Sequence, residues 1–281
     1  MAAEEQAEVV QETSTEGHEP TLFAEPIVHI GGFSITNSLI VTWFVVLLFA
    51  IFSLYLKKKL KEVPRGIQNV FEMIVDGALN LCDTVTGSRE KSMKFFPYVF
   101  TIFLFILVNN WLGLLPGVGT VGFYEMEEGK EVFIPFIRGG TADLNTTLAL
   151  SLMTVVGSHL VGVFMAGAWN HLNKFVNIKA LLEIPKKVLK DPTIVLVNPI
   201  KVFVGIIEII GEVAKVASLS FRLFGNIFAG EVLLASMMAI FAFILPVPFM
   251  FLELIVGVIQ ALIFAILSLV YMNIASTAEE H

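Results

Sequence analysis

The chain has 281 residues, of which 56% are apolar and only 15% are charged, and its mean hydropathy is +0.81. This is far more apolar surface than the core of a water-soluble domain needs, so the composition excludes a soluble protein and predicts a membrane protein with several spans. The formal net charge is -7, but the charges are clustered along the chain and therefore report on topology. The single cysteine, Cys82, excludes an internal disulfide and gives no metal-site pattern.

Residues 1–30 are predicted to form an acidic N-terminal extension. Residues 1–34 contain seven Glu and no Lys or Arg. The apolar run that follows lacks the basic region of a signal peptide, so we expect it to be a retained first span. We expect the extension to lie outside the membrane, with residues 1 to about 25 flexible.

Five apolar stretches are long enough to cross a bilayer, which takes about 20 residues in a helix. They predict an all-α integral membrane protein with one membrane domain over residues 31–276 and a short tail at 277–281. The predicted spans lie near 35–56, 95–115, 144–168, 200–240 and 249–275.

The basic residues are concentrated in two connections between spans. Residues 57–94 hold eight Lys or Arg and residues 170–201 hold six, whereas residues 116–146 hold two bases and five acids. The positive-inside rule therefore places the two basic connections in the cytoplasm. After five crossings, the N-terminus is expected outside and the C-terminal tail in the cytoplasm.

Two connections are candidates for interfacial helices. Within residues 66–86, apolar side chains recur every three or four positions, which is typical of an amphipathic helix lying along the membrane surface. The piece 174–197 contains Pro185 and Pro192, which makes its structure harder to predict.

The stretch 200–240 contains no proline. As one helix it would measure roughly 60 Å, about twice the thickness of the hydrocarbon core. It must then tilt steeply, run partly within the membrane plane, or break near Gly211. An interfacial helix over 200–215 followed by an ordinary span is the alternative. We favour a long, strongly tilted hairpin formed by the last two spans.

Arg222 lies within one of these apolar stretches. Placing a guanidinium in the bilayer centre costs about 3 kcal/mol or more. Glu208, Lys215 and Arg222 are seven residues apart and share one helix face, which also carries Ser218. Glu231 lies nine residues beyond Arg222, about half a turn around the helix. The pattern predicts two polar regions that open on different sides.

The last span supplies Glu253 and Gln260 on one face. One antiparallel alignment of the hairpin brings Gln260 near Arg222 and Glu253 near Glu231. Because arginine keeps its proton in proteins, Arg222 can repel protons and serve as counter-ion to a carboxylate from another chain. Two offset aqueous pockets would lead to that carboxylate from opposite sides.

Ordinary structural roles compete with these interpretations. Lys215 and Glu208 lie nearer the surface, where long charged side chains reach the headgroups. Ser218, Asn226 and Gln260 can hydrogen-bond between helices.

Structural roles are also possible for polar residues outside the hairpin. Asp143 can cap the helix that begins at 144. His159 is interpreted as a hydrogen-bonded histidine between helices, and Asn109 and Asn110 as helix-packing residues. For Arg222 itself, the alternative is an ion pair that ties two helices together.

The run Arg222-Leu-Phe-Gly-Asn-Ile-Phe-Ala-Gly-Glu231 closely resembles subunit a of F-type ATP synthases. The segments Asn109-Asn-Trp-Leu-Gly-Leu-Leu-Pro116 and Thr141-Ala-Asp-Leu-Asn-Thr-Thr147 are further similarities. The resemblance extends over about residues 30–276 in consistent order.

The resemblance implies a non-catalytic stator subunit of a rotary ATP synthase, with Arg222 facing the rotor carboxylate and separating two half-channels. The residues it implies for the outer half-channel are Asn226, Glu231, Glu253, Gln260 and Asp143. Those it implies for the cytoplasmic half-channel are Glu208, Lys215 and Ser218.

Glu253 departs from the family pattern, in which a His at this position accompanies the Glu that matches Glu231. Two neighbouring carboxylates repel each other, so we predict that Glu253 and Glu231 share one proton.

The resemblance also implies the partners: a c-subunit ring, b-type peripheral stalk subunits, other F0F1 subunits and the lipid bilayer, with no nucleic acid. No cofactor or metal ion is expected, and the sequence has no phosphate-binding loop, so nucleotide chemistry belongs to other subunits. The expected location is an energy-transducing membrane, taken as the bacterial plasma membrane, and the expected ion is H⁺.

Two other functional classes are alternatives. An ion-coupled secondary transporter would be favoured by inverted repeats with broken helices, and an intramembrane enzyme by a cluster of nucleophile, base or metal ligands. The sequence shows neither pattern.

Overall fold

The structure is a computed structural model, and it describes residues 21–61, 63, 65–115, 117–127, 130–169, 175, 194–241 and 244–277. Most of the predicted interfacial piece 174–197 lies outside the described residues. The elements in chain order are β1 (Pro26–Ile30), β2 (Phe33–Thr36), α2 (Asn37–Lys59), α3 (Ile67–Thr86), α4 (Arg89–Gly113), β3 (Gly122–Glu127), β4 (Lys130–Pro135), the 3₁₀ turn η1 (Gly140–Ala142), α5 (Leu144–Ala166), α8 (Ile194–Ile240) and α9 (Pro246–Ser276).

Among the described residues, five helices are long and apolar enough to cross a membrane, namely α2, α4, α5, α8 and α9. The prediction of about five membrane-crossing helices is therefore confirmed, and these helices overlap the predicted ranges, with ends that differ by a few residues. α2 runs on to Lys59 because its three terminal lysines suit the helix C-terminus, where the dipole favours cations. α9 begins at Pro246 because proline is pre-organised for the first position of a helix.

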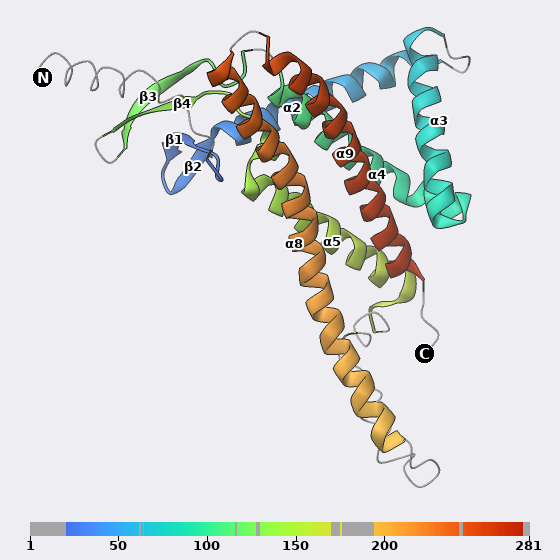
Figure 1. Cartoon of the computed structure of the whole chain (residues 1–281). Helices are drawn as coiled ribbons and strands as arrows, with labels where there is room; N and C mark the ends of the chain where they lie inside the picture. Colours follow the sequence, from blue (N-terminus) through green and yellow to red (C-terminus); the bar gives the residue numbers. More distant parts are fainter. Residues whose placement is uncertain are drawn as a thin grey trace, which may run out of the picture. The chain divides into compact units, whose positions relative to one another are not determined.

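α8 is one uninterrupted helix of 47 residues, drawn as a continuous ribbon in Figure 1. It passes through Gly211 without a break, so the separate interfacial helix over 200–215 is not formed. Its apolar part, Phe203–Ile240, has 38 residues and is about 57 Å long at 1.5 Å per residue. Since the hydrocarbon core is about 30 Å thick, this helix cannot lie along the membrane normal.

Two small antiparallel hairpins were not predicted from the sequence. β1 pairs with β2 just before α2, and β3 pairs with β4 inside the acidic loop 116–146. The second hairpin carries a cross-strand aromatic pair, Tyr124 and Phe133, with ring centroids 5.3 Å apart. Residues 26–30, expected as part of an extension, thus belong to a strand.

The chain forms two compact units. The first contains the described residues of Met1–Lys59, Leu104–Thr147 and Arg222–Ala261, and the second contains those of Leu60–Phe103, Leu148–Phe221 and Leu262–His281. The units share helices, because α4, α5, α8 and α9 each contribute to both.

The second unit includes the predicted amphipathic helix. α3 buries Cys82 in a cluster with side chains of α4 and α9, including Phe95 and Leu269. Several of its other apolar residues, such as Ile67 and Met73, are exposed. A helix with one packed face and one exposed apolar face suits the membrane surface.

Candidate functional site

In the first unit, α8 presents Arg222 and Asn226 on an exposed face. The adjacent Leu223 and Phe224 are buried, with 1% and 7% of their surface exposed. Asn226 Nδ2 donates a hydrogen bond to the Arg222 carbonyl at 2.8 Å, which orients the amide one turn beyond the arginine. Arg222 and Asn226 thus remain exposed beside packed neighbours on α8, and Arg222 also interacts with other residues of the chain.

Glu231, farther along α8, is paired with an arginine that was not predicted from the sequence. Arg138 Nη2 lies 2.8 Å from Glu231 Oε2, and Arg138 Nε donates to Glu231 Oε1 at 3.3 Å. Only 2% of Arg138 is exposed. A two-pronged contact of this kind fixes the carboxylate in orientation as well as position.

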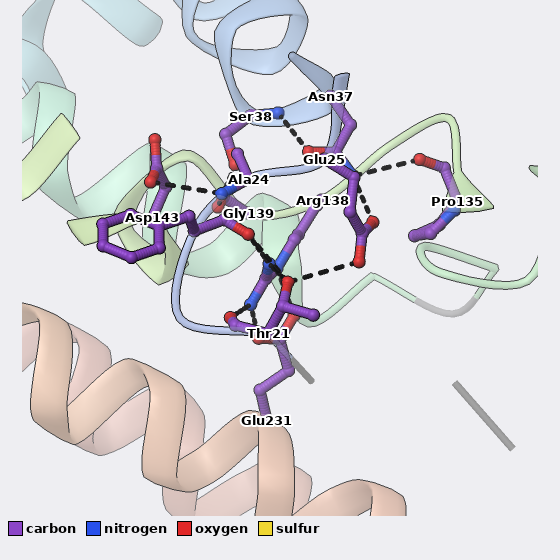
Figure 2. A network of polar contacts seen from close by, with 11 residues as sticks. Thr21, Ala24, Glu25, Asn37, Ser38, Pro135, Arg138, Gly139, Asp143 and Glu231 are labelled. Carbon is purple, nitrogen blue, oxygen red and sulfur yellow. Dashed lines mark hydrogen bonds and ion pairs between the residues drawn. The ribbon is translucent and has the colours of Figure 1, made fainter. Parts of the chain in front are cut away.

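The rest of the Arg138 guanidinium is held by residues 21–25, which we call the N-terminal strap. Nη2 donates to the Thr21 carbonyl at 2.7 Å, and Nη1 donates to Thr21 Oγ1 at 3.1 Å and to the Phe23 carbonyl at 3.2 Å. Figure 2 shows Arg138 between the strap and Glu231. The expected flexibility of the extension therefore does not apply to residues 21–25.

Asp143 closes the same network. Its Oδ1 accepts the backbone N–H of Asn145 at 3.1 Å, and its Oδ2 accepts the Thr146 hydroxyl at 3.1 Å. Asp143 is thus the N-cap of α5, which is the structural alternative that the sequence offered for this residue. Oδ1 also accepts the N–H of Ala24, at 3.3 Å, so the cap carries the strap as well.

Glu253 of α9 is 7% exposed and packs on the backbone of α8 at Gly230. A Cβ at position 230 would overlap the Glu253 carboxyl group, so glycine makes room for the acid. The contact falls within one residue of the alignment predicted from the sequence, which placed Glu253 beside Glu231. The glycine directly before Glu231 is the sequence signal for this close approach.

Two side chains of α4 hold α9 near this point. Asn110 Nδ2 donates to the Gly257 carbonyl at 3.0 Å, and Trp111 Nε1 donates to the Leu254 carbonyl at 3.2 Å. Asn110 also accepts the Thr141 hydroxyl at 2.6 Å. The packing role expected for Asn110 is confirmed. Gln260, three residues beyond Gly257, has a buried Oε1 with no hydrogen-bond partner among the described residues.

The second unit contains a separate charged cluster on α8. Glu212 Oε1 accepts the Lys215 ammonium at 2.7 Å, and Glu212 Oε2 lies 3.4 Å from His159 Nε2. The Lys215 ammonium also lies 5.1 Å from the centre of the Tyr271 ring. Lys215 was expected in this region, whereas Glu212 was missed, although it lies one turn before Lys215. His159 is indeed partnered between helices.

The other two residues expected on the cytoplasmic side differ in exposure. Glu208 is half-buried and Ser218 is exposed, and both make interactions within the chain. Across the described part of the chain, no three His, Cys, Asp or Glu side chains are grouped so as to hold a metal ion.

Known proteins similar to this chain point to one family. A sequence model described as ATP synthase A chain matches residues 39–273. The ATP synthase subunit a of Trichlorobacter lovleyi is 32% identical over 255 residues, covering 91% of this chain and 93% of that protein. The subunit a of Geobacter sulfurreducens is 33% identical over 85% of this chain and 87% of that protein.

The similarity is not confined to bacteria. The chloroplastic ATP synthase subunit a of Stigeoclonium helveticum is 33% identical over 254 residues, 90% of this chain and 89% of that protein. The family model spans the residues Arg222, Glu231 and Glu253. The chain therefore belongs to the ATP synthase subunit a family.

Proposed function

We propose that this chain conducts H⁺ to and from the carboxylates of a c-subunit ring through two offset half-channels, and that Arg222 separates these half-channels. Its family makes it the non-catalytic, ion-translocating stator subunit of the F0 membrane sector of ATP synthase. The proposal adds how the ions move and which residues couple their movement to rotation.

One observation carries the proposal: Arg222 lies exposed on a membrane-spanning helix. A guanidinium does not deprotonate in proteins, and exposing it to lipid is costly. A carboxylate on another chain would lower that cost by serving as its counter-ion. Such a carboxylate would release its proton on reaching Arg222 and would take up another proton after passing it. H⁺ would then cross in steps, without a continuous water path through the membrane.

Glu231, Glu253, Gln260, Asn226 and Asp143 are assigned to the outer half-channel. The buried carboxyl of Glu253 and the unpartnered oxygen of Gln260 both support this assignment, because buried polar atoms are normally satisfied by protein or water. The assignment of Asp143 is supported by its place in the network around Arg138 and Glu231.

Glu208, Lys215 and Ser218 are assigned to the cytoplasmic half-channel, and the ion pairs add Glu212 to this set. Charged groups within a membrane domain usually mark an ion pathway. Glu212 with Lys215 and His159 forms such a group in the second unit.

The family implies the other F0F1 subunits as partners, and we assign the direct contacts to the c ring and to b-type stalk subunits. The chain is a protein of an energy-transducing membrane, which we take to be the bacterial plasma membrane. We assign the N-terminus to the outside and the C-terminus to the cytoplasm. The contacts of the strap with Arg138 and Asp143 support a common side for the N-terminal segment and the acidic loop.

The test is Arg222→Ala in the complete ATP synthase, reconstituted in vesicles. ATP-driven H⁺ pumping should disappear while the enzyme still hydrolyses ATP. Arg222→Lys should fail as well, because a lysine can lose its proton. Val213→Ala, an exposed apolar position on the same helix, is the control and should pump normally. Pumping by Arg222→Ala at the wild-type rate would refute the proposal.

A further inference from the structure

Arg138 uses its full hydrogen-bonding capacity in a buried position. A guanidinium has five N–H donors, and Arg138 makes five hydrogen bonds: two to Glu231 and three to the strap at Thr21 and Phe23. Because the side chain is 2% exposed, water cannot replace a lost partner at low cost. Losing the contacts of Arg138 with either Glu231 or the strap therefore weakens its contacts with the other.

The strap has its own anchors, so it is a defined element and not a passing contact. Ala24 N–H is bound to Asp143 Oδ1. The buried Asn37 donates to Glu25 Oε2 at 3.1 Å through its side chain and to the Glu25 carbonyl at 3.1 Å through its backbone. Both anchors lie within four residues of the Arg138 contacts.

We propose that Arg138 is a positioning residue for ion transport: it fixes the Glu231 carboxylate in the outer half-channel, and the N-terminal strap fixes Arg138. The segment before the first span thereby contributes the strap to the ion pathway. This inference rests on the proposed role of Glu231 and adds two elements to it, a buried arginine and the main-chain carbonyls that hold it.

A lysine cannot take the place of Arg138. It has three donors on a compact ammonium, whereas the five contacts here spread over the planar fork of a guanidinium. The arrangement also predicts that Arg138 acts through Glu231, so that removing both side chains harms transport no more than removing one. A purely structural arginine would add its own loss to that of Glu231.

The experiment compares Arg138→Gln, Arg138→Lys, Glu231→Gln and the double variant Arg138→Gln with Glu231→Gln. Each is built into the complete ATP synthase and reconstituted in vesicles. ATP synthesis driven by an imposed pH gradient is measured, after co-purification with the other subunits has established assembly. Each single variant should synthesise ATP about tenfold more slowly or worse, since one hydrogen bond to a charged group is worth about that factor.

The double variant should stay within about twofold of the slower single variant, because the two positions form one interacting unit. Losses that multiply would overturn the claim that Arg138 acts through Glu231. Wild-type rates in Arg138→Gln or Arg138→Lys would overturn the positioning role itself. Arg222→Ala in the same vesicles separates the proposals: if it abolishes pumping while Arg138→Gln is normal, only the inference about Arg138 fails.

The strap is tested by deleting residues 2–25, with deletion of residues 2–20 as the matched control. The longer deletion should reproduce the loss of Arg138→Gln, and the shorter one should synthesise ATP at the wild-type rate. Equal losses in both deletions, or none in either, would overturn the role of the strap. If the longer deletion does not assemble, Thr21→Val removes one acceptor of Arg138 while keeping the side-chain shape. It should give a partial loss, and a wild-type rate would overturn the role of the strap.

Discussion

Gly230 offers a test of how closely the α8–α9 contact controls transport. In Gly230→Ala the new methyl group overlaps the Glu253 carboxyl group. Normal van der Waals separation is about 3.5 Å, so the carboxyl must retreat by about 1 Å. It forms the far end of a flexible side chain, which means the backbone can stay in place and the overlap is relieved by a change of rotamer.

Two opposing effects act on folding in this variant. Replacing glycine by alanine inside a helix stabilises it by about 1 kcal/mol, while overpacking costs about 1–3 kcal/mol. The net change should therefore lie between none and a loss of about 2 kcal/mol. Transport should suffer much more, because a 1 Å misplacement of a reacting group can cost about a hundredfold. We expect ATP-driven pumping to fall by a factor of about 10 to 100 in assembled complexes.

The assay is ATP-driven H⁺ pumping in vesicles, normalised to assembled enzyme. Gly211→Ala is the control, because a Cβ at this position of α8 meets no atom within 4 Å. Shortening the acid should relieve the overlap, so Gly230→Ala combined with Glu253→Asp should recover part of the activity. Normal pumping by Gly230→Ala, or no recovery in the combined variant, would refute the reasoning.

Three further changes test other parts of the site. Glu253→Gln should alter the dependence of ATP synthesis on the pH of the outer side if Glu253 and Glu231 share a proton, and an unchanged profile would remove that idea. Glu212→Gln keeps the shape of the side chain but removes the negative charge beside Lys215 and His159. We expect about tenfold slower pumping, and an unaffected rate would exclude Glu212 from the cytoplasmic pathway. Asn110→Ala leaves the Gly257 carbonyl and the Thr141 hydroxyl without their partner. It should lower stability by about 1–3 kcal/mol, measured as faster thermal inactivation, whereas an unchanged rate of inactivation would contradict the anchoring role of Asn110.

The membrane fold was largely predictable because the length and apolarity of a span are local properties of the sequence. The five spans and the long helix over 200–240 followed from runs of apolar residues and from the absence of proline within 200–240. The two hairpins were missed for the opposite reason. A short strand such as β3 is stable only when it is paired, and its partner cannot be read from its own residues.

The site was predictable where the residue type itself is unusual at its depth. Arg222, Glu231 and Glu253 stand out because they are charged within apolar segments. Arg138 does not stand out, since it lies outside the predicted spans, where a charge is ordinary, and 93 residues before its partner Glu231. The binding of the strap was missed for a related reason: three of its four contacts with Arg138 and Asp143 use backbone groups, which every residue has.

The central claim is that Arg222 keeps two half-channels apart, and passive H⁺ flow tests it most directly. Vesicles with the complete enzyme are given a pH gradient without nucleotide, and the decay of that gradient is followed for the wild type and for Arg222→Ala. The account predicts that Arg222→Ala leaks H⁺ faster than the wild type and no longer pumps. A variant that stays as tight as the wild type and still pumps would contradict it.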